Sequence, residues 1–278
     1  NPQADRTTFA YDAAGRRTVK RLANGTRASF SYDAADRLTR LANIKSTGVT
    51  ISSFDYNYDD VGNRTCVVES NGDRVTWVYD ITYQLTAERR SGANPYANTF
   101  VYDPAGNRTV LNAGGSRTTT TYDAANQIVY ALDSSGRTTY TFDANGNQAV
   151  VKRPSGNRTT TTWDYENHPL VYQSADSSRV TMTFNFENRR VKKQAGATTT
   201  NYIWDSENDS YLIETDGADG TAVVYTNEPH AFGRLISQRR ESTTRYYYFD
   251  PLGSMRGLSD PSETITDTSL YDAWGNEI

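Results

Sequence analysis

Aromatic residues alternate with polar or small residues along many short segments of this chain. Thr119 and Thr121, like Ser29 and Ser31, occupy the intervening positions. Side chains of a strand point alternately to its two faces, so this pattern predicts half-buried antiparallel strands with one aromatic face. We interpret that face as a packing surface, because aromatic rings stack along neighbouring strands, in preference to a ligand-stacking role. Its members include Phe9, Phe30, Tyr56, Trp77, Phe100, Tyr140, Tyr202 and Tyr247.

One motif recurs within this alternation: an aromatic residue followed directly by an aspartate or asparagine. It occurs twelve times, and successive copies lie 20 to 26 residues apart except for one interval of 45. A period near 21 residues predicts that one small unit is stacked on copies of itself. The aromatic residues of the doublets are Tyr11, Tyr32, Tyr58, Tyr79, Tyr102, Tyr122, Phe142, Trp163, Phe184, Trp204, Phe249 and Tyr271.

The residue three positions after each acid or amide suits a tight turn. Eleven of the twelve are Gly, Asn or Asp, which reach positive φ at least cost, and only Tyr83 departs. We expect the aspartate to accept hydrogen bonds from backbone N–H groups two or three residues later. The candidate site residues are therefore structural: Tyr11, Asp12, Gly15, Tyr58, Asp59, Gly62, Tyr102, Asp103, Gly106, Phe142, Asp143, Gly146, Asp250, Gly253, Tyr271, Asp272 and Gly275.

A second turn signal lies between most doublets, as in Asn24-Gly25, Asn71-Gly72 and Gly114-Gly115. Such dipeptides favour two-residue hairpins, so each unit is predicted to hold two short antiparallel strands. The fold class is predicted as all-β, a repetitive antiparallel hairpin array with very little helix. Since long sheets twist, we expect the array to curl into a spiral, a partial shell with open edges.

Composition and charge exclude several classes of function. The net charge of -4 and a pI near 5.3 give no electrostatic footprint for nucleic acid. No apolar run approaches the length of a membrane span, and the start of the chain lacks a signal-peptide pattern. We therefore expect no nucleic-acid partner and no membrane insertion. The opening Asn1-Pro2-Gln3 suggests a piece excised from a longer polypeptide, so missing targeting signals say little about the parent.

Candidate chemistry is sparse. Cys66 is the only cysteine of the chain, so it cannot form an internal disulfide. The chain has two histidines, His168 and His230, which with one cysteine are too few for an expected zinc site. The segment 143–147 is superficially similar to a calcium loop, but Pro154 stands where the bidentate Glu is needed, so turn capping is favoured. We expect no metal, no cofactor and no catalytic residue.

The repeats resemble the YD-repeat, or RHS-repeat, family. The resemblance is carried by Tyr-Asp-Ala-Ala-Gly-Arg at 11–16, Tyr-Asp-Asp-Val-Gly-Asn-Arg at 58–64 and Tyr-Asp-Pro-Ala-Gly-Asn-Arg at 102–108. The segments 246–260 and 271–276 resemble the opening of the RHS-associated core. The resemblance implies two regions: a repeat β-spiral of about ten units over 1–245, irregular over 206–245, and a core-like segment over 246–278.

The resemblance also implies a function. Such proteins are secreted or surface polypeptides of bacteria, with teneurins as animal relatives, and toxin-related members wind a hollow shell around a variable C-terminal toxin. The core of those members is an aspartyl self-protease whose cleavage motif would lie downstream of the opening. The segment 250–257 superficially satisfies that motif, but its neighbours match the earlier core element, so self-cleavage is not expected here.

Three classes of function remain open. The first is a noncatalytic scaffold that encloses and presents a C-terminal toxin or effector of the same polypeptide, with a possible secretion-apparatus or cell-surface partner. The alternative is a cell-surface adhesion or recognition module, such as a carbohydrate-binding one, and an enzyme is the least favoured. The interval from Trp204 to Phe249 skips one doublet and is expected to be a longer loop or a join, with a binding loop as the alternative.

Overall fold

The computed structural model describes residues 6–229 and 234–278, and the chain divides into two compact units. Unit 1 comprises Asn1–Ala97 together with Tyr225–Ile278, and unit 2 comprises Asn98–Val224. The described residues form strands and turns and contain no helix, so none could cross a membrane as a helix. The predicted all-β class is confirmed. His230 lies outside the described residues.

Strands of four to nine residues follow one another along both units. Unit 1 contains β1 (Thr8–Tyr11), β2 (Arg17–Arg21), β3 (Arg27–Tyr32), β4 (Leu38–Ile44), β5 (Thr50–Tyr58), β6 (Arg64–Glu69), β7 (Arg74–Tyr79), β8 (Leu85–Ser91), β22 (Leu235–Arg240), β23 (Thr243–Phe249), β24 (Met255–Ser259) and β25 (Ile265–Thr268). Unit 2 contains β10 (Arg108–Ala113), β11 (Ser116–Tyr122), β12 (Ile128–Asp133), β13 (Gly136–Phe142), β14 (Gln148–Lys152), β15 (Arg158–Trp163), β16 (Pro169–Gln173), β17 (Arg179–Phe184), β18 (Arg190–Ala195), β19 (Thr198–Asp205) and β20 (Ser210–Thr215). The junctions of the units fall within β9 (Tyr96–Tyr102) and β21 (Thr221–Asn227).

Pairing is antiparallel between strands that are consecutive in sequence, as hairpin turns require. In unit 2, for example, Thr120 pairs with Ala131 and Thr138 pairs with Ala131 on its other side. The register shifts by one residue just before most doublet aromatics, as between Thr121 and Tyr122. The extra residue lies on the returning strand, so these doublets are followed by a β-bulge that bends the strand next to the turn.

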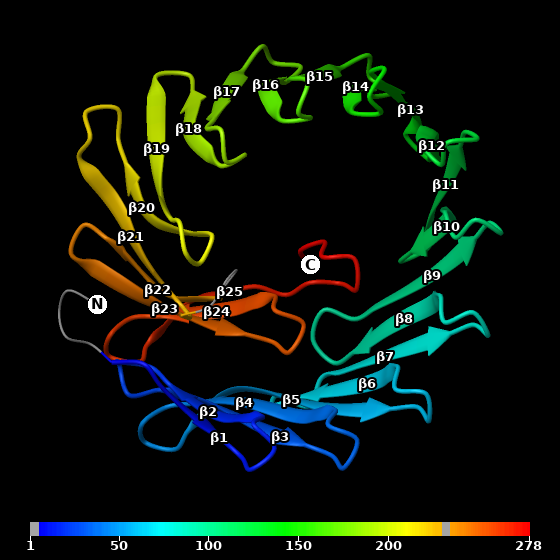
Figure 1. Ribbon diagram of the computed structural model, residues 1–278. Helices are drawn as coiled ribbons and strands as arrows, with labels where there is room; N and C mark the ends of the chain where they lie inside the picture. The colour runs from blue at the N-terminus through cyan, green and yellow to red at the C-terminus, as the bar shows by residue number, and fades with distance from the viewer. Residues whose placement is uncertain (1–5, 230–233) are drawn as a thin grey trace. The chain divides into compact units, whose positions relative to one another are not determined.

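Unit 1 has two layers. Strands β3–β7 bury a cluster of Ala28, Leu41, Phe54, Tyr56, Val67 and Val75. A second cluster joins Leu22 to Ile236, Tyr246 and Tyr248, which come from β22 and β23. Figure 1 shows these C-terminal strands, in orange and red, lying over the blue and cyan N-terminal strands of the same unit. The hydrophobic core of unit 1 is therefore shared between the two ends of the chain.

Unit 2 is a sheet with almost no buried residue. From Val101 to Asp209, all of which the structure describes, no residue is buried, and positions such as Thr118 and Tyr140 are half-buried. Phe100 and Val223, near its two ends, are its buried apolar residues. Backbone pairing and half-buried aromatic and threonine side chains hold this part of the chain together.

The interval from Trp204 to Phe249 differs from expectation. The predicted longer loop is wrong over most of this interval, because β20, β21, β22 and β23 occupy it. The turns between these four strands lack the aromatic-acid doublet. Asp216 heads the turn between β20 and β21, and Glu241 has positive φ in the turn between β22 and β23. Glu228 lies between β21 and β22, and its N–H donates to the carbonyl of Arg234 at 2.9 Å.

Candidate functional site

The acid of each doublet heads a closed turn. Asp103 Oδ1 accepts hydrogen bonds from the N–H groups of Ala105 at 3.0 Å and Asn107 at 2.9 Å, and its Oδ2 accepts from the Asn107 amide at 3.0 Å. The bonded N–H groups thus lie two and four residues after the acid, where two or three were expected. Equivalent pairs of bonds form at Asp12, Asp33, Asp59, Asp80, Asp123, Asp143, Asp164, Asn185, Asp250 and Asp272.

Positive φ follows three residues after the acid. Gly106 has φ of 87°, and even Tyr83 adopts φ of 65°. The Asp205 turn is the exception, because its positive φ falls on Asp209 instead of Asn208. The other glycines proposed for this position, each with positive φ, are Gly15, Gly62, Gly146, Gly253 and Gly275. The motif residues are thus spread through the repeats, one set per turn, and do not converge on one site.

The doublet aromatic also joins neighbouring repeats through a side-chain hydrogen bond, which we call a latch. The sequence did not reveal this bond. The Tyr122 hydroxyl donates to the backbone carbonyl of Arg108 at 3.1 Å, six residues after the preceding doublet aromatic Tyr102. Trp163 and Trp204 donate through Nε1 in the same way. The other latches are Tyr32 to Arg17, Tyr58 to Leu38 and Tyr79 to Arg64. Each latch ties a strand to the hairpin before it.

Arginines after the turn cover the aromatic face. The Arg16 and Arg37 guanidinium groups lie 5.0 and 4.9 Å from the ring centres of Tyr32 and Tyr58. Such cation–π contacts add attraction and shield the ring from water. An arginine directly after the positive-φ residue, as at Arg16 and Arg37, therefore covers the doublet ring of the next repeat. In the Gly-Asn-Arg sequence the arginine covers a ring of its own hairpin, since Arg64 lies 5.0 Å from the ring centre of Tyr56.

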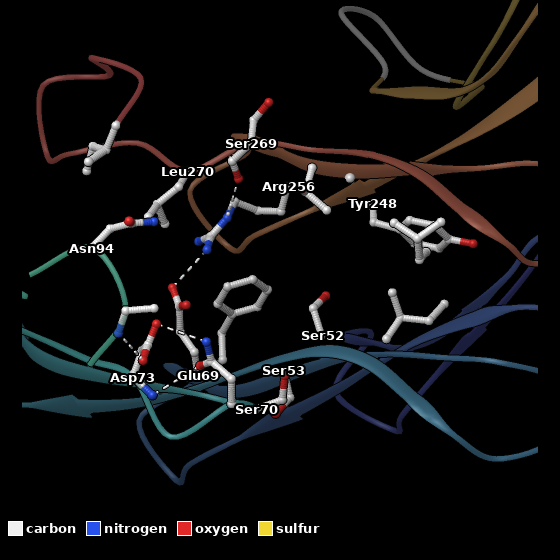
Figure 2. A pocket seen from close by; sticks show the side chains of 18 of the residues that line it. Ser52, Ser53, Glu69, Ser70, Asp73, Asn94, Tyr248, Arg256, Ser269 and Leu270 are labelled. Atoms are coloured by element: carbon white, nitrogen blue, oxygen red, sulfur yellow. Dashed lines mark hydrogen bonds and ion pairs between the residues drawn. The ribbon is translucent and has the colours of Figure 1, made fainter. Parts of the chain in front are cut away.

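Buried charged side chains are concentrated in unit 1, where the C-terminal strands meet the N-terminal sheet. A cavity of about 430 Å³ opens there, lined by residues of β5, β6, the loop after β8, β23, β24 and β25. Figure 2 shows Glu69 and Asp73 on one wall and Arg256 on the other, with Ser52, Ser53 and Ser70 on the side of Glu69 and Ser269 on the side of Arg256. None of its described lining residues is a histidine or a cysteine, so none of its serines has an imidazole or thiolate beside it.

A buried ion network crosses this cavity. Glu69 accepts from Arg90 on its own layer, with Nη2–Oε2 of 2.9 Å, and from Arg256 of β24, with Nη2–Oε1 of 2.9 Å. Arg90 also pairs with Asp73 at 2.6 Å, and Arg256 lies 4.9 Å from the Phe54 ring centre. Burial alone would raise the pKa of Glu69, but the two guanidinium groups outweigh it and hold this pKa below its usual range. The network therefore binds the C-terminal strands to the sheet electrostatically.

Two buried carboxyl groups nearby, those of Glu88 and Asp250, have raised pKa values, in contrast to Glu69. Burial raises the pKa of Glu88, although the Ala273 N–H at 3.0 Å and the Trp77 Nε1 at 3.1 Å both donate to it. Burial likewise raises the pKa of Asp250, whose carboxylate lies 3.6 Å from Arg256. The predicted motif residue Asp250 is thus beside the ion network, whereas Asp103 and Asp143 lie on exposed turns of unit 2.

Further polar contacts extend this interface along unit 1. Glu228 accepts from Arg17 at 2.9 Å and from the buried Lys20 at 3.3 Å. Ser46 N–H donates to Glu263 at 3.1 Å, and Asn24 Nδ2 donates to Ser259 at 3.1 Å. Sequence reasoning missed these residues, since partners more than 200 positions apart leave no local signal. The one signal available in the sequence was that charged residues stand in segments that form strands: Lys20 in β2, Glu69 in β6, and Glu88 and Arg90 in β8.

Among the described residues, one cluster of three side chains brings possible metal-ligand atoms close together. Asp164, Glu166 and His168 offer ligand atoms within 4.8 Å of one another. His168 Nδ1 lies 3.0 Å from Asp164 Oδ2, which is the position that the Asn107 amide occupies beside Asp103. His168 thus fills the motif's ordinary structural role. Cys66 is buried and 3.1 Å from Arg74 Nε.

Comparison with known proteins identifies related sequences and folds. The family model RHS Repeat matches residues 11–43. The tRNA3(Ser)-specific nuclease WapA of Bacillus spizizenii is 30% identical over 87 residues, which are 31% of this chain and 4% of that protein. The tRNA nuclease WapA of Bacillus subtilis is 29% identical over the same extent. The predicted resemblance to RHS-repeat proteins is confirmed.

Solved structures share the fold over nearly the whole chain. TcdB2-TccC3-TEV matches 97% of this chain with a TM-score of 0.68 and 17% identity, and the match covers 16% of that chain. The Photorhabdus luminescens Tc holotoxin pore matches 97% with a TM-score of 0.60 and 16% identity, covering 15% of that chain. This chain therefore spans less than one fifth of the solved chains and a small part of the curated relatives.

Proposed function

We propose that this RHS-repeat chain is a noncatalytic part of a β-shell that encloses and presents a C-terminal toxin or effector of the same polypeptide. The observation that carries the proposal is the fold shared with TcdB2-TccC3 over nearly the whole chain. The similarity to WapA, a nuclease by name, is a second link to effector proteins. The nuclease activity belongs to that protein, of which this chain matches a small part.

The chemistry of unit 1 supports a scaffold in preference to an enzyme. Its densest cluster of charges is internally paired, with Arg90 and Arg256 both bound to Glu69. Groups paired in this way hold two layers together and leave no acid or base directed at a substrate. We include in the proposal a secreted or bacterial surface location, two regions divided near residue 245, and structural roles for the motif residues.

The proposal is tested with the complete gene product that contains this chain, treated with a protease that cleaves exposed, unfolded segments. A shell predicts that any effector region beyond residue 278 resists the protease while the native fold persists, and is digested once mild denaturant opens it. A matched variant, Glu69→Ala, should lose protection at lower denaturant because it weakens the interface within unit 1.

Two results would overturn the proposal. One is an effector region that is digested at once in the native protein. The other is a polypeptide that binds cell surfaces or glycans through its repeats while enclosing no segment, which would favour the adhesion alternative.

A further inference from the structure

Unit 2 has two rims, because consecutive antiparallel strands turn at alternate ends of the sheet. We call the turns after β9, β11, β13, β15, β17 and β19 the acidic rim, and those after β10, β12, β14 and β16 the basic rim. Neighbouring turns on the same rim are separated by two strand spacings, so they lie about 9.6 Å apart. Since both rims belong to one sheet, they present their side chains at the same pitch.

The acidic rim carries aromatic side chains that the fold does not require. Tyr165 is 99% exposed and Phe186 is 93% exposed, each directly after the turn acid or amide. Ala124 and Ala144 stand at the same position of turns closed by the same hydrogen bonds. Large apolar side chains so fully exposed in neighbouring turns are a feature of interaction surfaces.

Exposed acids accompany these rings in a regular row. Glu166, Glu187 and Glu207 occupy the second position after the acid in three successive turns. Arg189 pairs with Glu187 at 2.9 Å and with Asp209 at 2.7 Å, which neutralises part of the charge. Asp164, Asp205, Glu166 and Glu207 leave this stretch of the rim acidic overall. An occupant of this surface must therefore be cationic and must offer some apolar contact.

The opposite rim of the same sheet has that composition. Its exposed bases are Arg117, Arg137, Lys152, Arg153, Arg158 and Arg179, against the exposed acids Asp133 and Asp176. Pro154 and Ala175 add exposed apolar surface at two of its turns. The two rims are thus complementary in charge and equal in pitch.

We propose that the acidic rim of one copy of this chain docks on the basic rim of a second copy. Tyr165 and Phe186 would contact the turns that hold Pro154 and Ala175, while the glutamates face Arg153, Arg158 and Arg179. The contact is heterologous, since it joins two different surfaces. This interaction is independent of cargo enclosure, because the rims are the ends of the strands and enclosure concerns the faces of the sheet.

The test measures self-association of the full chain by sedimentation at about 0.05 M and about 0.5 M NaCl. We expect concentration-dependent association at low salt that weakens about tenfold or more at high salt, because exposed charge pairs are screened. An acidic-rim variant combines Tyr165→Ala, Phe186→Ala, Glu166→Gln and Glu207→Gln. A basic-rim variant combines Arg153→Gln, Arg158→Gln and Arg179→Gln.

Each variant alone should be monomeric, whereas their equimolar mixture should form a one-to-one complex and nothing larger. Ile81→Ala is the matched control, since Ile81 is 96% exposed at the same motif position in unit 1, and it should leave association unchanged. A wild-type chain that stays monomeric up to about 1 mM would overturn the proposal. Association that survives both rim variants, or an acidic rim that binds only polylysine and not a second copy, would also overturn it.

Discussion

Units 1 and 2 are built from the same repeat, yet only unit 1 has a buried core. Strands β4 and β5 of unit 1 bury Leu41 and Phe54, with 3% and 2% of each residue exposed, whereas residues 101–209 of unit 2 bury none. The turns and the strand pairing are alike in both. We infer that the doublet motif specifies strands and turns, whereas burial depends on a second layer that the C-terminal strands supply.

The second layer also changes the electrostatics. Unit 1 buries the charged residues Lys20, Asp73, Glu88, Arg90, Glu228, Asp250 and Glu263, whereas the buried polar residues of unit 2 are the neutral Asn98, Ser210 and Thr215. Buried charges need partners, and those in unit 1 find many of them across the two layers. The same repeat therefore tolerates either an exposed sheet or a charged, docked interface.

The largest expected effect is on the ion network of unit 1. Glu69→Ala leaves Arg90 and Arg256 without their shared carboxylate and should lower the free energy of unfolding by about 3–5 kcal/mol. Asp55→Ala breaks the exposed Arg40–Asp55 pair of the same sheet and should cost about 1 kcal/mol or less. Denaturant unfolding measures both. Equal effects would contradict a docked second layer.

The next effect concerns a turn of unit 2. Gly106→Val forces a branched side chain to φ near 87°, and Asp103→Ala removes bonds to Ala105 and Asn107. Each should cost about 1–3 kcal/mol. The loss should appear as faster amide exchange in β9 and β10, while unit 1 is unchanged. Ala105→Ser serves as control, and equal exchange in all three variants would refute the turn's role.

A smaller effect is expected from one latch. Tyr122→Phe removes the hydroxyl that donates to the Arg108 carbonyl and should destabilise unit 2 by about 1 kcal/mol. Tyr165→Phe, which removes a hydroxyl from a fully exposed ring, should have no effect on thermal unfolding. A Tyr122→Phe protein that melts like wild type would show that the latch contributes nothing.

The smallest effect is a pH dependence. Burial raises the pKa of Glu88 above its unfolded value, so the folded state binds the extra proton between the two values. This contribution to stability therefore grows as the pH falls from the folded pKa toward the unfolded value of about 4.3. As the pH falls through that window, the melting temperature of the wild type should rise more than that of the Glu88→Gln variant. Parallel curves for the two proteins would contradict the raised pKa.

The repeat and its turns could be predicted from the sequence because their signals are local. The doublets and the positive-φ residues lie within a few positions of one another, and the structure places strands and turns there, Tyr83 included. The latch from Tyr122 to Arg108 was missed because it joins a side chain to a backbone atom, which has no residue-type signature.

The docked interface could not be predicted, because its contacts join residues far apart in sequence. Arg256 and Glu69 are separated by 187 positions, and no periodicity links them. The interval from Trp204 to Phe249 was expected to be a longer loop or a join because it skips a doublet. The loop was wrong over most of the interval, because strand propensity in segments such as Thr221–Asn227 outweighs that missing signal. The division near residue 245 stays a prediction.

Amide hydrogen exchange resolved along the chain tests the central contrast most directly. Strands β4 and β5 of unit 1 and β13 and β14 of unit 2 have similar antiparallel pairing but differ in burial. We predict that the central amides of β4 and β5 exchange about 100-fold more slowly or more, because opening them also exposes the shared core. Equal protection in the two pairs would contradict the account that the second layer, and not the repeat itself, provides the stability of unit 1.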